Sequence, residues 1–252
     1  METVAFIAAM RQETRPLLRR IGPSRRDWIG RFPCFRFELC GRDCVLLETG
    51  VGIARATDGV RALISLFRPG MAVSFGIAGA PRRGLAIGDV VAGRGVHRLE
   101  SGRAGLARPL AALSDAAFNA AAEPLGLVGA RLSWGSVLTT WGDQALSASA
   151  AVENPVLEME SAGIADACAE AGVPLYAFRA ISDSVDEPLP FSLSDYLDER
   201  QQLMVGRLAA AVIRRPHLLP ALLRLARNAG RAADNAALAA LAAVQEMLRD
   251  SR

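Results

Sequence analysis

Uninterrupted apolar runs that end in glycine or polar residues constrain the fold of this chain most strongly. The runs at 3–10, 71–80 and 175–182 are apolar along nearly their whole length and do not alternate with polar residues. Such runs are typical of strands that are buried on both faces of a sheet. Residues 53–67 have the apolar spacing of a helix, and Pro69 and Gly70 follow as a stop signal. Buried strands that alternate with helices predict an α/β fold with helices on both faces.

The rest of the chain fits the same pattern. Further strands are predicted at 35–39, 43–50, 87–93 and 129–140, and further helices from residue 11, over 101–125 and over 160–171. The predicted fold is a three-layer α/β/α arrangement around a central mixed, largely parallel sheet. A length of 252 residues suits one large α/β domain. We expect residues 1–206 to form this domain and residues 207–252 to form a C-terminal basic, amphipathic helical extension of it.

Composition excludes several classes of protein. A net charge of +3 argues against a nucleic-acid-binding protein. The chain has no lysine, so no lysine Schiff base can operate. Four cysteines and two histidines have no zinc-binding spacing, and we expect no metal and no cofactor. No apolar run is long enough for a membrane span, and the first ten residues lack a basic leader, so a cytoplasmic location is expected.

A glycine turn follows the predicted strand at 43–50. Its sequence, ETGVGIARA (48–56), places Gly50 and Gly52 between a strand and a helix. A dinucleotide fingerprint would need a third glycine where Arg55 stands and an acid about twenty residues further on, and both are missing. Two interpretations remain: a turn that brings backbone amides close to an anion or a sugar, and a tight turn without a ligand.

Two other strand ends carry unusual residues. SFGIAGAPRRGLAIGDVV (74–91) breaks a buried strand with several glycines, which indicates close approach of the backbone to another group. RAISDSVDE (179–187) ends a buried strand with Ser182 and Asp183. Polar groups at the carboxyl ends of parallel strands line the ligand crevice in open α/β sheets. The alternative is that Asp183 caps a following helix.

Five motifs in this order resemble the purine nucleoside phosphorylase and nucleosidase superfamily, close to its methylthioadenosine/S-adenosylhomocysteine nucleosidase and futalosine hydrolase branches. They are spread over residues 4–183. The motifs are VAFIAAMRQETRPLL, TGVGIARA, SFGIAGAPRRGLAIGDVV, LEMESAGIA and VPLYAFRAISD. The resemblance implies an enzyme that cleaves the N-glycosidic bond of a purine nucleoside of the adenosine type.

The chemistry of that reaction needs a proton for the leaving purine, a positioned nucleophile and a grip on the ribose. By the resemblance, Asp183 is the acid that protonates the purine, Glu13 activates the attacking water, and Glu160 binds the ribose hydroxyls. Glu160 alone could also be an acid favoured by a helix N-terminus. Its neighbour Glu158 is either solvated or paired with an arginine.

The resemblance also implies the residues that surround the substrate. The expected substrate-binding residues besides Glu160 are Met159, Ile77, Ala78, Gly79, Trp141, Thr140 and Ser182. Trp141 is the candidate for stacking on the purine, and a tryptophan buried in the core is the alternative.

The chain departs from the family pattern at two positions. Many members have a small hydroxyl residue where Ile77 stands, and phosphorolytic hexamers have an arginine where Ser74 stands. Because a phosphate nucleophile needs a fork of donors such as arginine, these departures favour hydrolysis. Phosphorolysis stays as the alternative, since Arg11, Arg55 or Arg82 could restore an anion site. A non-catalytic nucleoside-binding module is the rival of a different class.

The tail from Arg200 to Arg231 contains seven arginines and no acid. Around residues 218–231, leucines and arginines fall on opposite sides of a predicted helix. Such a segment could lie on the inner face of the membrane, or it could pack on the domain or on a subunit partner. The tail resembles that of the hopanoid-associated phosphorylases, which implies an adenosylhopane-type lipid nucleoside as a possible substrate. The superfamily resemblance implies a homo-oligomer.

Overall fold

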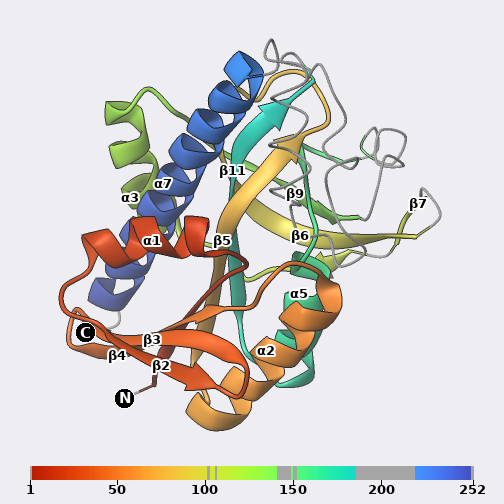
Figure 1. The fold of residues 1–252 in the computed structure, drawn as a ribbon. Helices are drawn as coiled ribbons and strands as arrows, with labels where there is room; N and C mark the ends of the chain where they lie inside the picture. The colour runs from red at the N-terminus through yellow and green to blue at the C-terminus, as the bar shows by residue number, and fades with distance from the viewer. Residues whose placement is uncertain are drawn as a thin grey trace.

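The computed structural model describes residues 2–100, 103–105, 107–140, 149, 152–185 and 219–250. A central sheet lies between two layers of helices, as Figure 1 shows. The strands are β1 (Val4–Ala8), β2 (Arg25–Ile29), β3 (Phe32–Leu39), β4 (Arg42–Glu48), β5 (Met71–Ala80), β6 (Val90–Glu100), β7 (Arg103–Ala104), β8 (Arg108–Pro109), β9 (Leu132–Thr139), β10 (Pro155–Glu158) and β11 (Leu175–Ser184). The helices are α1 (Arg11–Arg20), α2 (Ile53–Phe67), α3 (Asp115–Leu127), α5 (Ser161–Glu170) and α7 (Leu219–Asp250).

The sheet is mixed, with a parallel centre. Its order is β10-β9-β6-β11-β5-β1-β4-β3-β2. Strand β5 pairs in parallel with β1 and β11, and β1 pairs in parallel with β4. The hairpin β2–β3 adds antiparallel strands at one edge, and β6 runs antiparallel to β11. Because β1, β4, β5 and β11 run in the same direction, their carboxyl ends meet at one edge of the sheet.

Helices cover both faces of this sheet. On one face, α1 and α3 pack against α7, and on the other face α2 packs against α5. The strands supply apolar side chains to both sides: Phe6 and Phe75 face the first layer, while Ile7 and Ala78 face the second. Such strands are apolar throughout because neither face meets water. The predicted three-layer α/β/α architecture is therefore confirmed.

Several predicted elements agree closely with the structure, and others do not. The helix at 53–67 and the strand at 71–80 have the predicted bounds. The helix predicted over 101–125 was wrong in its first half, because α3 begins only at Asp115, where the Ser114 hydroxyl caps the backbone N–H of Ala117 at 3.2 Å. Strands β2 and β10 were not predicted.

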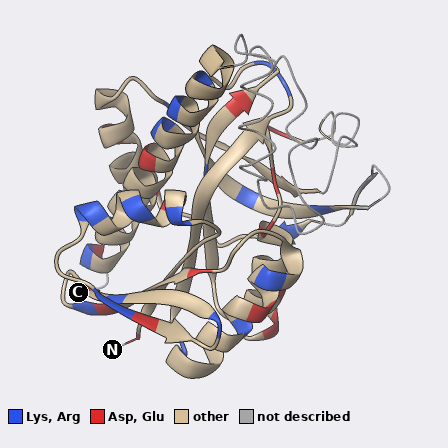
Figure 2. Ribbon diagram, in the orientation of Figure 1, with Lys and Arg blue, Asp and Glu red and all other residues tan. Residues whose placement is uncertain are grey.

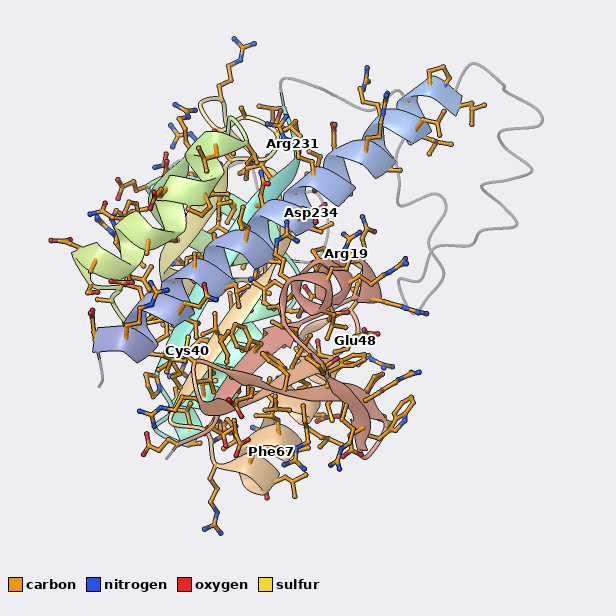
Figure 3. All side chains as sticks on the ribbon, turned by 90° about the vertical axis from the view of Figure 1, so that its left-hand side faces the viewer. Arg19, Cys40, Glu48, Phe67, Arg231 and Asp234 are labelled. Carbon is orange, nitrogen blue, oxygen red and sulfur yellow. The ribbon has the colours of Figure 1, made fainter. Side chains whose placement is uncertain are left out.

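The C-terminal helix α7 is part of the core along most of its length. Its buried face consists mainly of alanines, which let the helix lie close to β5 and β11. Asp234 on its outer side forms ion pairs with Arg19 and Arg20 of α1, at 3.2 and 3.1 Å. Figure 3 labels Asp234 and Arg19. Among the residues that the structure describes, no helix is both long and apolar enough to cross a membrane.

Candidate active site

The carboxylate of Glu13 lies at the carboxyl ends of β1 and β5. Helix α1 begins just after β1, which places Glu13 in its first turn. The Glu13 Oε2 atom accepts hydrogen bonds from the backbone N–H groups of Ala9 and Met10, each at 2.9 Å. Its Oε1 atom accepts one from the N–H of Ile77, also at 2.9 Å. A carboxylate has about four acceptor positions, so these three bonds leave roughly one for a ligand.

Close packing explains the glycine at position 76. A Cβ atom on Gly76 would collide with the Glu13 carboxylate. Glycine at this position of the central strand therefore lets the backbone of β5 approach the Glu13 carboxylate closely, as the sequence indicated. Burial raises the pKa of Glu13, and the three backbone donors and the charge of Arg179 oppose part of that rise.

Glu160 is bound by the glycine turn that follows β4. The backbone N–H of Gly52 donates to Glu160 Oε1 at 2.8 Å, and that of Met159 donates to Oε2 at 3.3 Å. Gly52 has a φ of 101°, a conformation that favours glycine. The turn therefore does bring an amide to an anion, and among the described residues that anion is a side chain of the protein. Two of the four acceptor positions of Glu160 remain.

Burial and the nearby Glu158 carboxylate raise the pKa of Glu160 to about 8, while the Gly52 N–H opposes the rise. Near neutral pH the carboxyl group therefore holds a proton in most of the population. A partly protonated carboxyl group can both donate and accept hydrogen bonds, as a pair of sugar hydroxyls can.

Glu158, in contrast, accepts hydrogen bonds from the protein on both of its oxygens. Its Oε1 accepts from the Thr139 hydroxyl at 2.6 Å. Its Oε2 accepts from the backbone N–H groups of Glu160 and Ser161, at 3.0 and 2.8 Å, and lies 3.5 Å from Arg179. Of the two alternatives for Glu158, the structure shows pairing with an arginine rather than solvation.

Arg179 connects this buried network to the central strand. It lies on β11 and is only 3% exposed. One terminal nitrogen donates to the hydroxyls of Ser74 and Ser161, at 2.7 and 2.6 Å, and lies within 3.5 Å of Glu158. The other donates to the carbonyl of Phe178 at 3.0 Å. Most donors of this guanidinium group are therefore bound to the protein itself.

Asp183 lies at the end of β11 beside a β-bulge. The register between β11 and β5 shifts between Ile181 and Asp183, so Ser182 is the extra residue. Ser182 is buried and its hydroxyl donates to Asp183 Oδ1 at 2.6 Å. Gly79 pairs with Asp183, and a Cβ atom there would lie 2.7 Å from Oδ2. Asp183 itself is exposed among the residues that the structure describes.

Glu13 and Glu160 line the same small cavity. Ser74, Ile77 and Arg179 line it as well, and its volume is about 10 Å³. A cavity of roughly 10–15 Å³ is large enough for one water molecule. The arginines proposed for a phosphate do not line this cavity: Arg11 lies in another groove, Arg55 donates to the Thr49 carbonyl, and Arg82 donates to the Ser149 carbonyl.

The other predicted site residues are placed as follows. Ile77, Ala78 and Gly79 lie on β5 between Glu13 and Asp183, and the Ala78 carbonyl lies 3.4 Å from the Ser182 hydroxyl. Met159 lies beside Glu160. Thr140 follows β9, and its N–H donates to the Glu158 carbonyl at 3.0 Å. Trp141 lies outside the described residues.

The sequence analysis missed the residues that support these acids. Arg179, Thr139 and Ser161 were not singled out. For Arg179 the signal was present, since a charged residue inside an apolar strand must find buried partners. Thr139 and Ser161 had no such signal, because a hydroxyl at a strand end or a helix start is common. Across the described parts of the chain, no three His, Cys, Asp or Glu side chains are placed to hold a metal ion.

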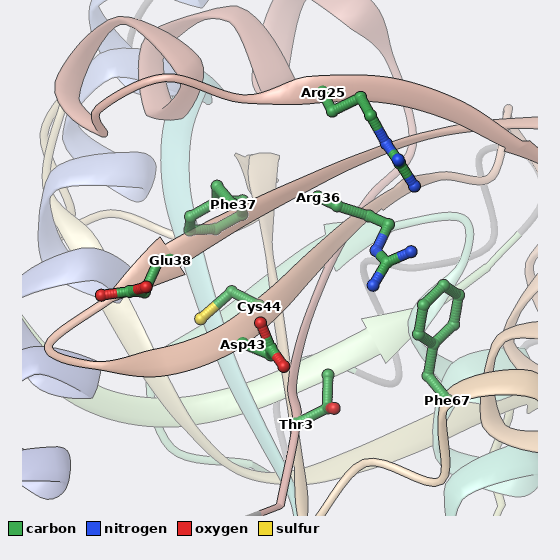
Figure 4. A pocket seen from close by; sticks show the side chains of 8 residues that line it. All are labelled: Thr3, Arg25, Arg36, Phe37, Glu38, Asp43, Cys44 and Phe67. Atoms are coloured by element: carbon green, nitrogen blue, oxygen red, sulfur yellow. The ribbon is translucent and has the colours of Figure 1, made fainter.

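A larger cavity, of about 300 Å³, lies at the opposite edge of the sheet (Figure 4). Thr3 precedes β1, and Cys44 lies near the start of β4, so this cavity is at the amino ends of the parallel strands. The Arg36 guanidinium lies over the Phe67 ring on one side of it, at 5.6 Å from the ring centroid. Ligands in open α/β sheets bind at the carboxyl ends, and we therefore assign no part of the glutamate chemistry to this cavity.

Comparison with known proteins identifies the family of this chain. A model described as the phosphorylase superfamily matches residues 3–214. The chain belongs to this superfamily. A 5'-methylthioadenosine/S-adenosylhomocysteine nucleosidase of Actinobacillus succinogenes is 29% identical over 82% of this chain and 98% of its own length. The family resemblance drawn from the five motifs is therefore confirmed.

Solved structures of superfamily members share the fold. The nucleosidase of the same name from Neisseria meningitidis, in complex with methylthio-immucillin-A, matches with a TM-score of 0.69 and 23% identity, over 97% of this chain and 99% of that chain. A mutant of futalosine hydrolase of Helicobacter pylori matches with a TM-score of 0.70 and 17% identity, over 98% of this chain and all of that one. At these identities the two matches establish the fold alone.

Proposed function

We propose that this protein is a nucleoside N-glycosidase that hydrolyses the bond between a purine and its ribose in an adenosine-type nucleoside. The observation that carries the proposal is the small cavity in which Glu13, Glu160 and Arg179 meet at the carboxyl ends of the strands. The similarity to nucleosidases over four fifths of the chain supports the same reaction class.

Glu13 positions and activates the water in this proposal. Its carboxylate has about one acceptor position left, and the cavity that it lines has room for about one water. A water that donates to Glu13 gains nucleophilicity as the carboxylate takes up its proton. The raised pKa of Glu13 makes it a stronger base than an ordinary glutamate.

Glu160 binds the ribose hydroxyls, and Asp183 donates the proton to the departing purine. The two positions of Glu160 that the protein leaves open suit two neighbouring hydroxyls, one of which can donate to the carboxyl group while the other accepts its proton. The Ser182 hydroxyl binds Asp183 Oδ1 and leaves Oδ2 for the base. Met159, Ile77, Ala78 and Gly79 line the sugar side, while Thr140 and Trp141 are proposed for the base.

Water suits this site better than phosphate. A phosphate dianion would have to lie beside two carboxyl groups, those of Glu13 and Glu160. Arg179 could compensate the charge only by giving up its bonds to Ser74 and Ser161. Phosphorolysis is therefore the less favoured candidate.

The reaction is tested with a panel of nucleosides. The panel contains adenosine, inosine, methylthioadenosine, S-adenosylhomocysteine and an adenosine whose 5′ carbon carries a long alkyl or hopane-type chain. We expect release of free adenine at a rate that added phosphate does not change, measured by chromatography of the base. Release that occurs only with phosphate would establish phosphorolysis. If the protein binds these compounds and releases no base, it is a nucleoside-binding module.

The first turns of α7 support a further proposal, peripheral contact with a membrane. Leu219 and Leu223 are about half exposed, at 46% and 54%, and Arg224 and Arg227 are exposed beside them. Leucines that enter the membrane interface and arginines that meet anionic headgroups would together hold the protein at the membrane, close to a lipid-linked nucleoside.

A homo-oligomer is proposed on the superfamily resemblance. A mass equal to that of a single chain in light scattering would contradict it.

Co-sedimentation with anionic vesicles tests the membrane contact. Changing both Leu219 and Leu223 to serine should reduce the pelleted fraction. The matched control changes Leu66 and Leu127, which are also exposed but lie on α2 and α3, to serine. Equal pelleting of the wild type and both variants would remove the membrane proposal. A chain that ends before α7 cannot replace these variants in the test, because α7 belongs to the hydrophobic core and its removal would disturb the fold.

A further inference from the structure

A groove between α1 and the hairpin β2–β3 contains three arginines in one cavity of about 190 Å³. Arg11 and Arg15 come from α1, and Arg26 comes from β2. We propose that this groove, called the arginine groove below, binds a small phosphate monoester, a site separate from the glycosidic chemistry. The proposal does not depend on the proposed function, because its readout is binding.

The three guanidinium groups have no carboxylate partners within the described residues. Their neighbours do: Arg19 and Arg20, further along α1, both pair with Asp234, and Arg25 pairs with Asp27. Three like charges around one cavity repel each other, and this repulsion falls when an anion binds between them. The groove therefore differs from the rest of α1, which compensates its arginines.

The charge of the groove matches a phosphate monoester. Its lining includes three arginines and one acid, Glu48, which gives +3 − 1 = +2. A phosphate monoester carries about −1.5 to −2 at pH 7. Guanidinium groups present planar donor forks that suit phosphate oxygens. Glu48 would repel the anion. One oxygen of Glu48 already accepts a hydrogen bond from the Thr14 hydroxyl at 3.1 Å. Glu48 lies at the end of β4, beneath α1 in Figure 3.

The floor of the groove is apolar. Leu18, Pro33 and Phe35 line it and are all partly buried. Arg26 is held at one side by its contact with the Trp28 ring, at 5.2 Å from the centroid. Sites for drug-sized ligands measure about 300–1,000 Å³, so this smaller groove fits a compact organic group. A phosphate with a single ring or short chain uses both the charge and the floor.

Helix α1 separates this groove from the glutamate cavity. Arg11, Thr14, Arg15 and Leu18 follow the spacing of one helix face, whereas Glu13 points to the other side. Figure 2 shows the basic residues that lie along α1. A ligand in the groove would therefore contact the outer face of the helix whose inner face holds Glu13.

Calorimetric titration with phenyl phosphate at low salt tests the proposal. The wild type should bind it saturably and more tightly than inorganic phosphate, because the apolar floor adds contact. The variant Arg11→Gln/Arg15→Gln/Arg26→Gln should bind at least about tenfold more weakly, since charge-assisted bonds to phosphate are lost. The matched control Arg42→Gln/Arg68→Gln/Arg249→Gln removes the same charge elsewhere and should bind within about twofold of the wild type.

Three outcomes would overturn the proposal. If the wild-type protein does not bind phenyl phosphate saturably, the groove is not a binding site for it. If both triple variants bind phenyl phosphate equally weakly, the loss of binding comes from the net charge of the protein and not from the groove. Binding to phosphatidylglycerol vesicles that needs the three arginines, without binding of phenyl phosphate, assigns the groove to a lipid headgroup instead. Phosphatidylcholine vesicles serve as the reference, and a thermal melt of each variant checks that it folds.

Discussion

Replacing Asp183 by asparagine is expected to lower kcat for release of the purine by roughly 10²–10⁴-fold, the usual contribution of a general acid, with little change in KM. The amide keeps the shape of the carboxyl group and can still bind the base, but it cannot transfer a proton. A loss confined to kcat is the signature of an interaction used in the transition state. The measurement is steady-state release of free base from the best substrate of the panel.

Two controls accompany this variant. Asp58→Asn makes the same chemical change at an exposed carboxyl group, which pairs with Arg31 at 2.9 Å, and should leave kcat unaltered. Ser182→Ala removes only the hydroxyl that donates to Asp183 at 2.6 Å and should cause a smaller loss than Asp183→Asn. An Asp183→Asn protein that turns over at the wild-type rate would refute Asp183 as the acid.

Replacing Arg179 by methionine is expected to lower the free energy of unfolding by about 3–5 kcal/mol, because it leaves the buried Glu158 without a counter-charge. The hydroxyls of Ser74 and Ser161 lose their donor in the same change. Removing both charges, in Arg179→Met/Glu158→Gln, should restore part of the loss, since a neutral pair needs no compensation. Guanidinium denaturation of the two single variants and the double variant measures the coupling.

An exposed ion pair provides the contrast. Arg61 binds Glu170 through two hydrogen bonds, at 2.9 and 2.8 Å, on the surface. Arg61→Met should lower the free energy of unfolding much less than Arg179→Met does, because water screens exposed pairs. If Arg179→Met lowers the free energy of unfolding no more than Arg61→Met does, the buried network around Arg179 does not stabilise the fold as its geometry indicates. Arg179→Lys, which keeps the charge, provides a folded variant should the methionine variant fail to fold.

The sequence predicted the fold well where burial decides the pattern. Strands β1, β5 and β11 are apolar because helices cover both of their faces, and the runs are visible for that reason. Strand β2 was missed because it lies at the sheet edge and is mostly exposed, with arginines and an aspartate in place of an apolar run. The helix over 101–125 was overextended because alanine content outweighed the stop at Pro109 and the cap at Ser114.

The site was predictable only in part. Family motifs pointed to Glu13, Glu160 and Asp183, and the glycines marked where the backbone comes close to them. The different hydrogen-bond partners of Glu158 and Glu160 could not be predicted, because the donors come from β9, β11 and the turn before α2. A sequence shows two similar acids, and only their surroundings show that Glu158 accepts more hydrogen bonds from the protein than Glu160 does.

The hydrogen bonds that build the site join remote parts of the chain. Ile77 binds Glu13 across 64 positions, Gly52 binds Glu160 across 108, and Arg179 binds Ser74 across 105. No fragment that lacks β11 can contain the whole arrangement. During synthesis, the cavity that Glu13 and Glu160 line stays without Arg179 until that strand has left the ribosome. The nascent chain consequently passes most of its translation with this cavity incomplete.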